Sequence, residues 1–263
     1  MVDLSPVTFP SLAALPWLRH GVTTRSAALP LDGNMSFAAA PTQHDAVIAC
    51  RERWLTTIDR SLESAIFSGL VHATTTQRVA SSDMGRGAFT PETIIPRTDA
   101  LMTDTPGVTL VMCFGDCVPL LVIDPEQRVI ALGHAGWRGT VRGMAGSLVR
   151  SMVECFGSDP QSLVAVVGPS ISPAVYEVGT EVVDTFQAAY PGDGAIVRRG
   201  SSWYLDLWQA NTTQLMVAGL RYDRVQCSGI CTFANGARFF SHRYAKAHDE
   251  FDGRFAVMLS IEG

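Results

Sequence analysis

At 263 residues, with 47% hydrophobic and 17% charged side chains, the chain has the composition of a globular protein large enough to bury a sizeable core. Its formal net charge of -5 and its isoelectric point near 5.6 provide no basic footprint for nucleic acid or for an anionic membrane. Lys246 is the sole lysine among 20 basic residues, which excludes a phosphate-binding loop of the GK[ST] type.

The sequence has no pattern typical of a membrane span, a secretion signal or a disulfide framework. No stretch reaches the roughly 18 apolar residues that a membrane span needs, and the first twenty residues lack the basic start and apolar core of a secretion signal. We therefore expect a cytoplasmic protein that binds neither membrane nor nucleic acid, with no obligate protein partner evident. The six cysteines are too sparse for a disulfide framework, so we expect reduced thiols.

Strand-like and helix-like segments alternate along the chain without a repeat or a convincing boundary, so we expect one domain over residues 1–263. Hairpins as well as helices join the strands, which favours an α/β or α+β fold with a mixed sheet and flanking helices. A loop is expected at 81–96, which is rich in Gly, Ser and Pro. The expected strands are 65–71, 109–114, 119–123, 128–134, 163–168, 203–206, 225–231 and 254–261, and the expected helices are 140–156, 181–189 and 207–218.

The segment GDCVPLLVIDPEQRVIALGHAGWRG, residues 115–139, carries the strongest chemical signal. Two apolar runs flank Asp124-Pro125, a favoured start of a tight turn, and predict an antiparallel hairpin. Cys117 lies seven residues before Asp124 and His134 seven after Gln127, so a symmetric hairpin places them directly opposite each other. Opposed residues have Cβ atoms about 4.5–5.5 Å apart, close enough for a thiolate and an imidazole to share a metal ion or a proton.

A catalytic zinc ion typically takes three protein ligands and leaves one position for water, so a third ligand is needed. His72 follows an apolar strand, as His134 does, and is weakly preferred on that ground. His20 and His242 also end apolar or aromatic segments, so the choice stays open at this level. The remaining histidines are His20, His44, His72, His242 and His248.

The turn after His134 leads into a helix expected to begin near Thr140. Its glycines allow close backbone approach, and the N–H groups of a helix N-terminus favour an anion. Arg138 in this turn, together with Arg25, is therefore predicted to contact phosphate or another substrate anion at the rim of the pocket. The alternative is that the glycines serve only a sharp turn and that the arginines form structural salt bridges.

Several blocks of the chain resemble the YfiH-like, laccase-domain family. GDCVPLLVID followed by GHAGWRGT is similar to the ADCxP…HAGWRG core of that family. The likeness extends over most of the chain, and the resemblance implies an α/β fold with a zinc site made by His72, Cys117 and His134, with copper as a further possibility. The other matching blocks are HGVTTR (20–25), TDALMT (98–103), VGPSISPAVYEVG (167–179), LDLWQANTTQL (205–215) and CTFANGARFFSHR (231–243).

Three positions depart from the pattern of the family. The usual QxHG at the first histidine reads Leu70-Val71-His72-Ala73, so a polar neighbour of the site is lost. A Gly-Gly pair after HGVTTR is replaced by Ala27-Ala28. The CYEV pattern reads Val175-Tyr176-Glu177-Val178, which removes a cysteine.

Members of this family have been described as multicopper polyphenol oxidases, as zinc-dependent enzymes of purine nucleosides and as editors of peptidoglycan precursors. Several coppers acting together need many imidazoles, commonly in HxH pairs, whereas this chain has six histidines and no HxH. The resemblance therefore implies a zinc-dependent purine nucleoside phosphorylase with adenosine deaminase activity, whose partners are a nucleoside and phosphate. The alternatives are a cysteine hydrolase, with Cys117 as nucleophile and His134 as base, and a non-catalytic zinc module with a fourth ligand from Cys113, Asp116 or another histidine.

Overall fold

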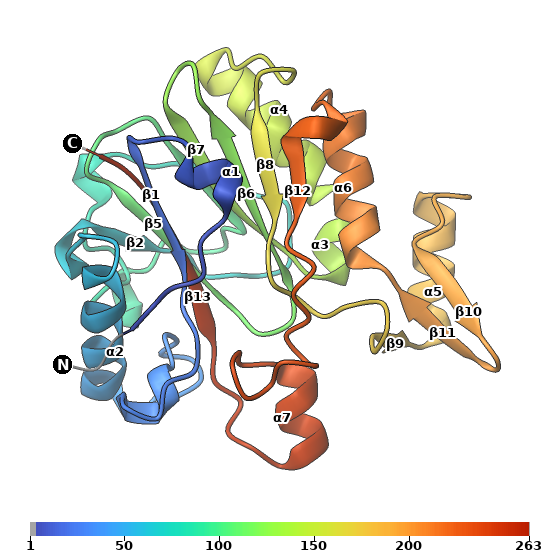
Figure 1. The fold of residues 1–263 in the computed structure, drawn as a ribbon, viewed down its shortest axis with the longest axis horizontal. Helices are drawn as coiled ribbons and strands as arrows, with labels where there is room; N and C mark the ends of the chain where they lie inside the picture. The colour runs from blue at the N-terminus through green and yellow to red at the C-terminus, as the bar shows by residue number, and fades with distance from the viewer. Residues whose placement is uncertain (1–3, 263) are drawn as a thin grey trace.

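Two β-sheets lie face to face at the centre of the fold, and helices cover their outer faces (Figure 1). The computed structural model describes residues 4–262. The strands are β1 (Leu18–Val22), β2 (Ala65–Phe67), β3 (Thr76–Arg78), β4 (Ala100–Thr103), β5 (Thr109–Phe114), β6 (Val118–Asp124), β7 (Val129–Ala135), β8 (Val164–Val167), β9 (Glu177–Val178), β10 (Ile196–Arg199), β11 (Ser202–Leu205), β12 (Val225–Cys227) and β13 (Phe255–Ile261). The α-helices are α1 (Pro10–Ala13), α2 (His44–Thr56), α3 (Trp137–Val141), α4 (Met144–Phe156), α5 (Thr180–Ala189), α6 (Leu207–Val217) and α7 (His242–His248).

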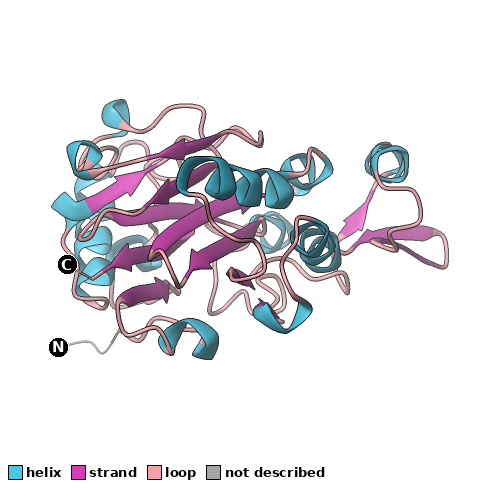
Figure 2. Cartoon of the chain, turned by 90° about the horizontal axis from the view of Figure 1, so that it is seen from above, coloured by secondary structure: helices cyan, strands magenta, loops and turns pink. Residues whose placement is uncertain are grey.

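Both sheets mix parallel and antiparallel strands, as the expected fold class requires. The four-stranded sheet has the order β1-β13-β5-β2, and the six-stranded sheet has the order β12-β8-β6-β7-β4-β3. A third sheet of three strands, β10-β11-β9, forms with α5 a lobe that projects from one side of the molecule (Figure 2). In the part of the chain that the structure describes, no helix has the length and apolarity needed to cross a membrane.

Strand β6 is buried along its whole length because it serves two cores at once. Leu120 and Val122 point to the core under α4 and α6, whereas Leu121 and Ile123 point to the core between the two sheets. This alternation follows because successive side chains of a β-strand point to opposite faces of the sheet. Cys117 packs against the core between the sheets, so its side chain shares the face of Leu121 and Ile123.

The hairpin of β6 and β7 differs in register from the symmetric one that the sequence predicts. Asp124 pairs with Val129, which leaves a loop of Pro125, Glu126, Gln127 and Arg128. The Asp124 carboxylate accepts the N–H groups of Glu126 and Gln127, and Arg128 closes the loop with a φ of 54°. His134 is therefore opposite Pro119, and the expectation that it is directly opposite Cys117 is wrong.

The shift in register is an even number of residues, so it leaves the two side chains on one face. Continuing the β6–β7 pairing beyond Val118 and Ala135 brings Cys117 opposite Gly136, two residues after His134. Diagonal neighbours on one face of an antiparallel pair are still within reach of each other. The hairpin thus delivers both residues to the same end of the layer between the sheets.

The helix expected at 140–156 is two helices. Gly143 has a φ of 81°, a left-handed conformation that interrupts the helix and separates α3 from α4. The buried side of α4 packs on the six-stranded sheet. α3 has only five residues. The expected binding of an anion by the N-terminus of a long helix is therefore not supported here.

Other predicted elements keep their place with adjusted ends. β5 and α6 match their predicted positions, and the Asp206 carboxylate caps α6 by accepting the N–H of Gln209. The segment 81–96 contains two short 3-10 turns and no α-helix or β-strand. The strands β1, β3, β4, β9 and β10 and the helices α1, α2 and α7 are not among the predicted elements.

Candidate metal centre

Three side chains converge where β6 and β7 meet the turn that leads from one sheet to the other. His72, Cys117 and His134 offer one ligand atom each, and these atoms all lie within 4.8 Å of one another. The rings of His72 and His134 have centroids 5.0 Å apart and lie at 73° to each other. Within residues 4–262 the cluster contains no fourth ligand, so the fourth protein ligand considered for a closed zinc module is not found there.

The carboxylate of Asp99 positions two of the three ligands. It is fully buried beside β4 and accepts the backbone N–H groups of His72 and Ala73, each at 2.9 Å, and that of Val71 at 3.2 Å. It also lies 3.2 Å from Nδ1 of His134. When Nδ1–H donates to Asp99, Nε2 of His134 is the nitrogen left free to bind a metal.

Burial by itself opposes the charge of Asp99, but its bonds to His134 and to the backbone N–H groups outweigh burial and lower the pKa of this carboxyl. The ionised carboxylate of Asp99 is therefore the form that holds His134 and the His72 loop in place. His72 has a φ of 58°, a conformation that costs a non-glycine residue free energy, and the bonds to Asp99 from its own N–H and its neighbours hold it there.

Gly136 leaves the space that the cluster occupies. A Cβ atom at this position would lie 2.8 Å from Sγ of Cys117 and 3.0 Å from Cδ2 of His72. No side chain fits at this distance unless the ligands move. Gly136, which directly follows β7, is therefore a steric requirement of the site, in addition to its place in the turn.

The cluster favours a thiolate on Cys117. Burial raises the pKa of a thiol, but the neighbouring His134 and His72 outweigh this and lower the pKa of Cys117 to about 6. For His134 the balance is reversed: burial lowers its pKa, and the Cys117 thiolate and the Asp99 carboxylate together raise it to about 9. A thiolate is the form of cysteine that binds metals.

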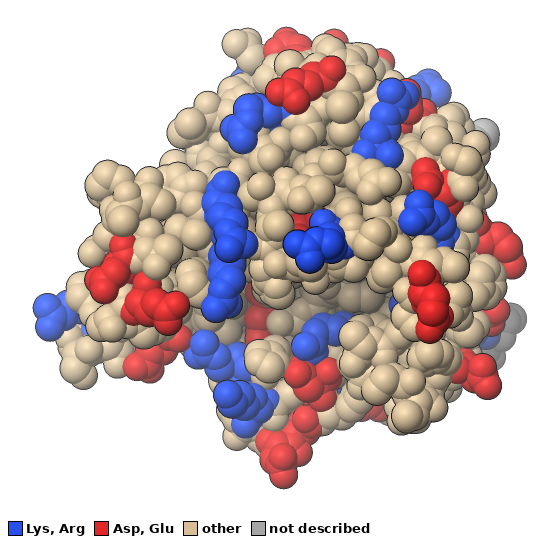
Figure 3. Space-filling view, turned by 180° about the vertical axis from the view of Figure 1, so that it is seen from behind, with Lys and Arg blue, Asp and Glu red and all other residues tan. Residues whose placement is uncertain are grey.

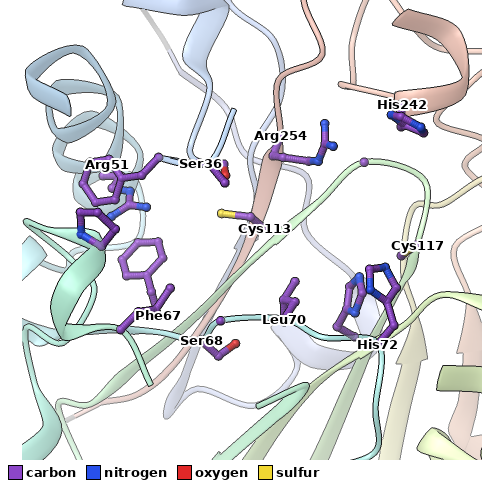
Figure 4. A pocket seen from close by; sticks show the side chains of 17 residues that line it. Ser36, Arg51, Phe67, Ser68, Leu70, His72, Cys113, Cys117, His242 and Arg254 are labelled. Atoms are coloured by element: carbon purple, nitrogen blue, oxygen red, sulfur yellow. The ribbon is translucent and has the colours of Figure 1, made fainter. Parts of the chain in front are cut away.

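Two cavities meet at the cluster. The larger has a volume of about 600 Å³ and extends from His72 and Cys117 to Arg51 and Phe67 at its other end (Figure 4). Arg51 is 2% exposed, is sandwiched between Phe37 and Phe67, and donates to the carbonyl groups of Met35, Gly87 and Ala88.

The smaller cavity, of about 330 Å³, lies on the other side of the cluster and is lined by two arginines and by Asp116. Arg138 of α3 and Arg243 of α7 line it, and Tyr176 lies beneath the Arg243 guanidinium, 5.2 Å from ring centroid to Cζ. Basic side chains also gather on the back of the molecule, where the projecting lobe joins the body (Figure 3). Local positive charge of this kind attracts anions although the chain is acidic overall.

The sequence predicts Arg25 and Arg138 beside the site, and the structure brings only Arg138 there. Arg25 lines a separate hollow, where its guanidinium bonds Asp32 and Glu250, each at 3.0 Å, and the carbonyl of Gly236 at 2.9 Å. Its charge is thus satisfied by carboxylates. Sequence reasoning about chemistry missed Asp99 and Arg243, although both lie in blocks that carry the family resemblance, TDALMT and CTFANGARFFSHR.

The donor set fits a metal of borderline softness. Two imidazole nitrogens and one thiolate match three positions of a tetrahedral zinc site and leave one position for a water or a substrate atom. The same donors also bind copper, so they do not identify the metal. His72 and Cys117 both line the two cavities, so the open position is accessible from either side.

Comparisons with known proteins identify the family and the fold. The family model described as multi-copper polyphenol oxidoreductase laccase matches residues 19–262, and the chain belongs to this family. Purine nucleoside phosphorylase YlmD of Bacillus subtilis (strain 168) is 36% identical over 199 residues, which cover 75% of this chain and 72% of that protein. A purine nucleoside phosphorylase of Bacteroides thetaiotaomicron is 30% identical over 247 residues, 92% of each chain. The crystal structure of YlmD from Geobacillus stearothermophilus has a TM-score of 0.89 at 31% identity and covers 97% of this chain and 94% of its own.

Replacing Asp99 by asparagine tests its role in positioning the ligands. The amide puts an N–H₂ group where four donors now converge, so we expect the affinity for zinc to fall about 10- to 100-fold. Competition with a chelator of known affinity measures this. Asp104→Asn, which alters an exposed ion pair with Arg78, is the matched control. Equal zinc affinities in the two variants would contradict the role of Asp99.

Gly136→Ala tests the steric requirement at the cluster. The added methyl group meets Cys117 and His72 at less than van der Waals distance, so we expect metal to be lost from a protein that keeps its far-ultraviolet circular dichroism. Gly179→Ala is the control, because a Cβ there has no neighbour within 4 Å. Metal analysis of both purified variants decides. A Gly136→Ala protein with a full complement of metal would refute the argument.

Proposed function

We propose that the chain is a zinc-dependent purine nucleoside phosphorylase with accompanying adenosine deaminase activity. The observation that carries the proposal is the position of the His72–Cys117–His134 cluster between two cavities. The arginines of the larger cavity are engaged by carbonyl groups and by Asp252, whereas Arg138 and Arg243 line the smaller one. A phosphorolysis has two substrates of different character, an uncharged nucleoside and a phosphate ion. The names of the relatives from Bacillus subtilis and Bacteroides thetaiotaomicron support the same activity.

In this proposal the nucleoside occupies the larger cavity. Its volume of about 600 Å³ lies within the range of roughly 300–1,000 Å³ that small-molecule sites occupy. Phe67, Leu70 and Ile94 offer apolar surface for a purine ring. Ser68 lines the cavity as well, and its buried hydroxyl has no hydrogen-bond partner within the described part of the chain, so a polar group of a ligand could satisfy it.

Phosphate occupies the smaller cavity. An arginine guanidinium binds phosphate through two parallel N–H···O bonds and stays charged at every relevant pH. The Arg138 guanidinium lies over the Trp137 ring, 4.3 Å from Cζ to the ring centroid. Among residues 4–262 its N–H groups have no hydrogen-bond partner, so they remain available. Arg243 uses its N–H groups on the carbonyl of Glu177, at 3.2 Å, and contributes its charge.

His72, Cys117 and His134 would hold the zinc ion, which when bound supplies a Lewis acid at the junction of the two substrates. Asp99 keeps His134 in the tautomer that presents Nε2 and keeps His72 facing the cluster. The same junction suits removal of the amino group of adenosine by water, and for this reason the proposal includes deamination.

The low pKa of Cys117 favours one other reading, the cysteine hydrolase. A thiolate paired with His134 is the arrangement of a cysteine nucleophile and its base. Two features speak for a ligand instead: a second histidine reaches the sulfur, and Asp99 aligns both histidines toward it. A metal-bound thiolate is not free to attack an amide, so the metal content separates the two functions.

The proposal is tested first on the unmodified protein and on Cys117→Ser. We expect the parent protein to be isolated with about one zinc ion per chain and to release hypoxanthine and ribose 1-phosphate from inosine only when phosphate is present. Cys117→Ser should lose both zinc and turnover, because an alcohol at neutral pH is a poor substitute for a thiolate ligand.

Cys113→Ser is the control for this test, since Cys113 lines the same cavity four residues away and is not in the cluster. It should keep its metal and its activity. A parent protein that carries no metal and cleaves an amide would support the hydrolase instead. A parent that carries copper and oxidises phenols would support the activity named by the family description.

The phosphate site is tested with Arg138→Ala. A hydrogen bond to a charged group contributes about 1.5–3 kcal/mol, so the KM for phosphate should rise by about 10- to 100-fold. The KM for inosine should change little, because the nucleoside lies in the other cavity. Arg25→Ala, outside both cavities, should leave the KM for phosphate as it is. A rise in the KM for phosphate in Arg25→Ala, with no rise in Arg138→Ala, would contradict the placement of phosphate in the smaller cavity.

A further inference from the structure

His242 stands at the wall that the two cavities share. The residues that line both cavities are His72, Gly115, Cys117 and His242. Two of these are metal ligands and one has no side chain, so His242 is the one titratable group of the shared wall that the cluster does not use. Figure 4 shows His242 apart from His72 and Cys117, at the start of α7.

The orientation of His242 is set by a carboxylate. Its Nδ1 lies 2.8 Å from Oδ2 of Asp252, and Asp252 in turn bonds the guanidinium of Arg254. Arg254 is fixed by the carbonyl groups of Asp252 and Gly253 and lies over Gly115, where a Cβ would come within 2.9 Å of its Cδ. When the Nδ1–H of an imidazole donates to a carboxylate, its Nε2 remains free to interact with a ligand.

Nε2 of His242 has no hydrogen-bond partner among residues 4–262. The His242 side chain is 57% exposed, so a proton on Nε2 exchanges with solvent. It therefore combines three properties of a general acid: a fixed ring, a free nitrogen and a position between the two substrates. Asp252 bonds His242 directly. The other charged groups, imidazoles, phenol and cluster thiol that line the two cavities are Arg51, His72, Asp116, Cys117, His134, Arg138, Tyr176, Arg243 and Arg254.

We propose that His242 is the general acid that protonates the departing purine and that Asp252 is its positioning residue. This inference rests on the proposed phosphorylase function. Nothing in the motifs that suggested the metal site assigns a role to this histidine, which the sequence offers only as one of several possible third ligands.

The reaction balances with the residues at hand. A phosphate oxygen forms a bond to C1′ of the ribose, and the bond from C1′ to N9 breaks with its electron pair moving to the purine. Protonated His242 transfers its Nε2 proton to N7 of the purine, so the base leaves neutral. The hydrogen phosphate dianion becomes the monoanion of ribose 1-phosphate, and the neutral imidazole takes up a proton from solvent.

The leaving group provides a test that separates proton donation from a structural role. A nucleoside methylated at N7, such as 7-methylinosine, already carries the positive charge on its base and needs no proton to leave. General acid catalysis contributes about 10²- to 10⁴-fold, so kcat on inosine should fall by at least about 100-fold in His242→Gln. On 7-methylinosine the same variant should stay within about tenfold of the parent. Asp252→Asn should show the same selectivity with a smaller loss.

His248→Gln is the matched control, because it makes the same substitution on the same helix at a residue that lines neither cavity. It should resemble the parent on both nucleosides, and all variants should keep their zinc. Equal losses of His242→Gln on the two nucleosides, or no loss on inosine, would overturn the inference while the phosphorylase function stands. A parent protein that releases no base from either nucleoside would overturn the proposed function and the inference with it.

Discussion

The buried carboxylate of Asp99 is the constraint on which the candidate site depends. It is attached to β4, and β4 pairs with β7 so that the N–H of His134 bonds the carbonyl of Asp99 at 2.8 Å. The same residue therefore holds His134 by both backbone and side chain. Its carboxylate also binds the loop of His72, which arrives from β2 in the other sheet. One buried anion thus fixes two ligands that are far apart in the sequence.

The arrangement of the sheets explains why a site exists at this position. β5 belongs to the four-stranded sheet and β6 to the six-stranded sheet, so residues 115–117 cross from one layer to the other. A crossing at the end of two packed sheets cannot be filled by regular side-chain packing, and cavities remain on its two sides. Gly115 and Gly136 keep this crossing narrow, because a Cβ on either would meet Arg254 or Cys117 within 3 Å.

Local sequence patterns predict the parts of this structure that local forces determine. The turn at Asp124, the apolar strand β6 and the helix α4 follow from turn chemistry and from the spacing of apolar residues. The placement of Cys117 and His134 on one face survives an error in register, since the face depends only on whether the offset is even. The break at Gly143 was not predicted, because a single glycine within an amphipathic stripe is often tolerated in a helix.

Local sequence patterns do not predict contacts between segments that are distant in the sequence. Nothing in the sequence around His72 specifies a left-handed residue bound by Asp99, which lies 27 positions later. The family resemblance, rather than local pattern, identified His72 as the third ligand. Arg25 was expected at the site, and the structure places it elsewhere. An arginine that pairs with Glu250 across 225 positions cannot be distinguished, from its neighbours alone, from one that awaits a phosphate.

The departures from the family pattern acquire a physical meaning in this context. Ala73 is tolerated in place of glycine because its φ is not positive, and its N–H still binds Asp99. Leu70 has a different effect, since it lines the larger cavity where the family pattern has glutamine and so removes an amide from the wall. Sites reject close analogues mainly by leaving buried polar groups unpaired. With Leu70 apolar, this wall of the cavity offers a ligand fewer hydrogen bonds than the family pattern provides.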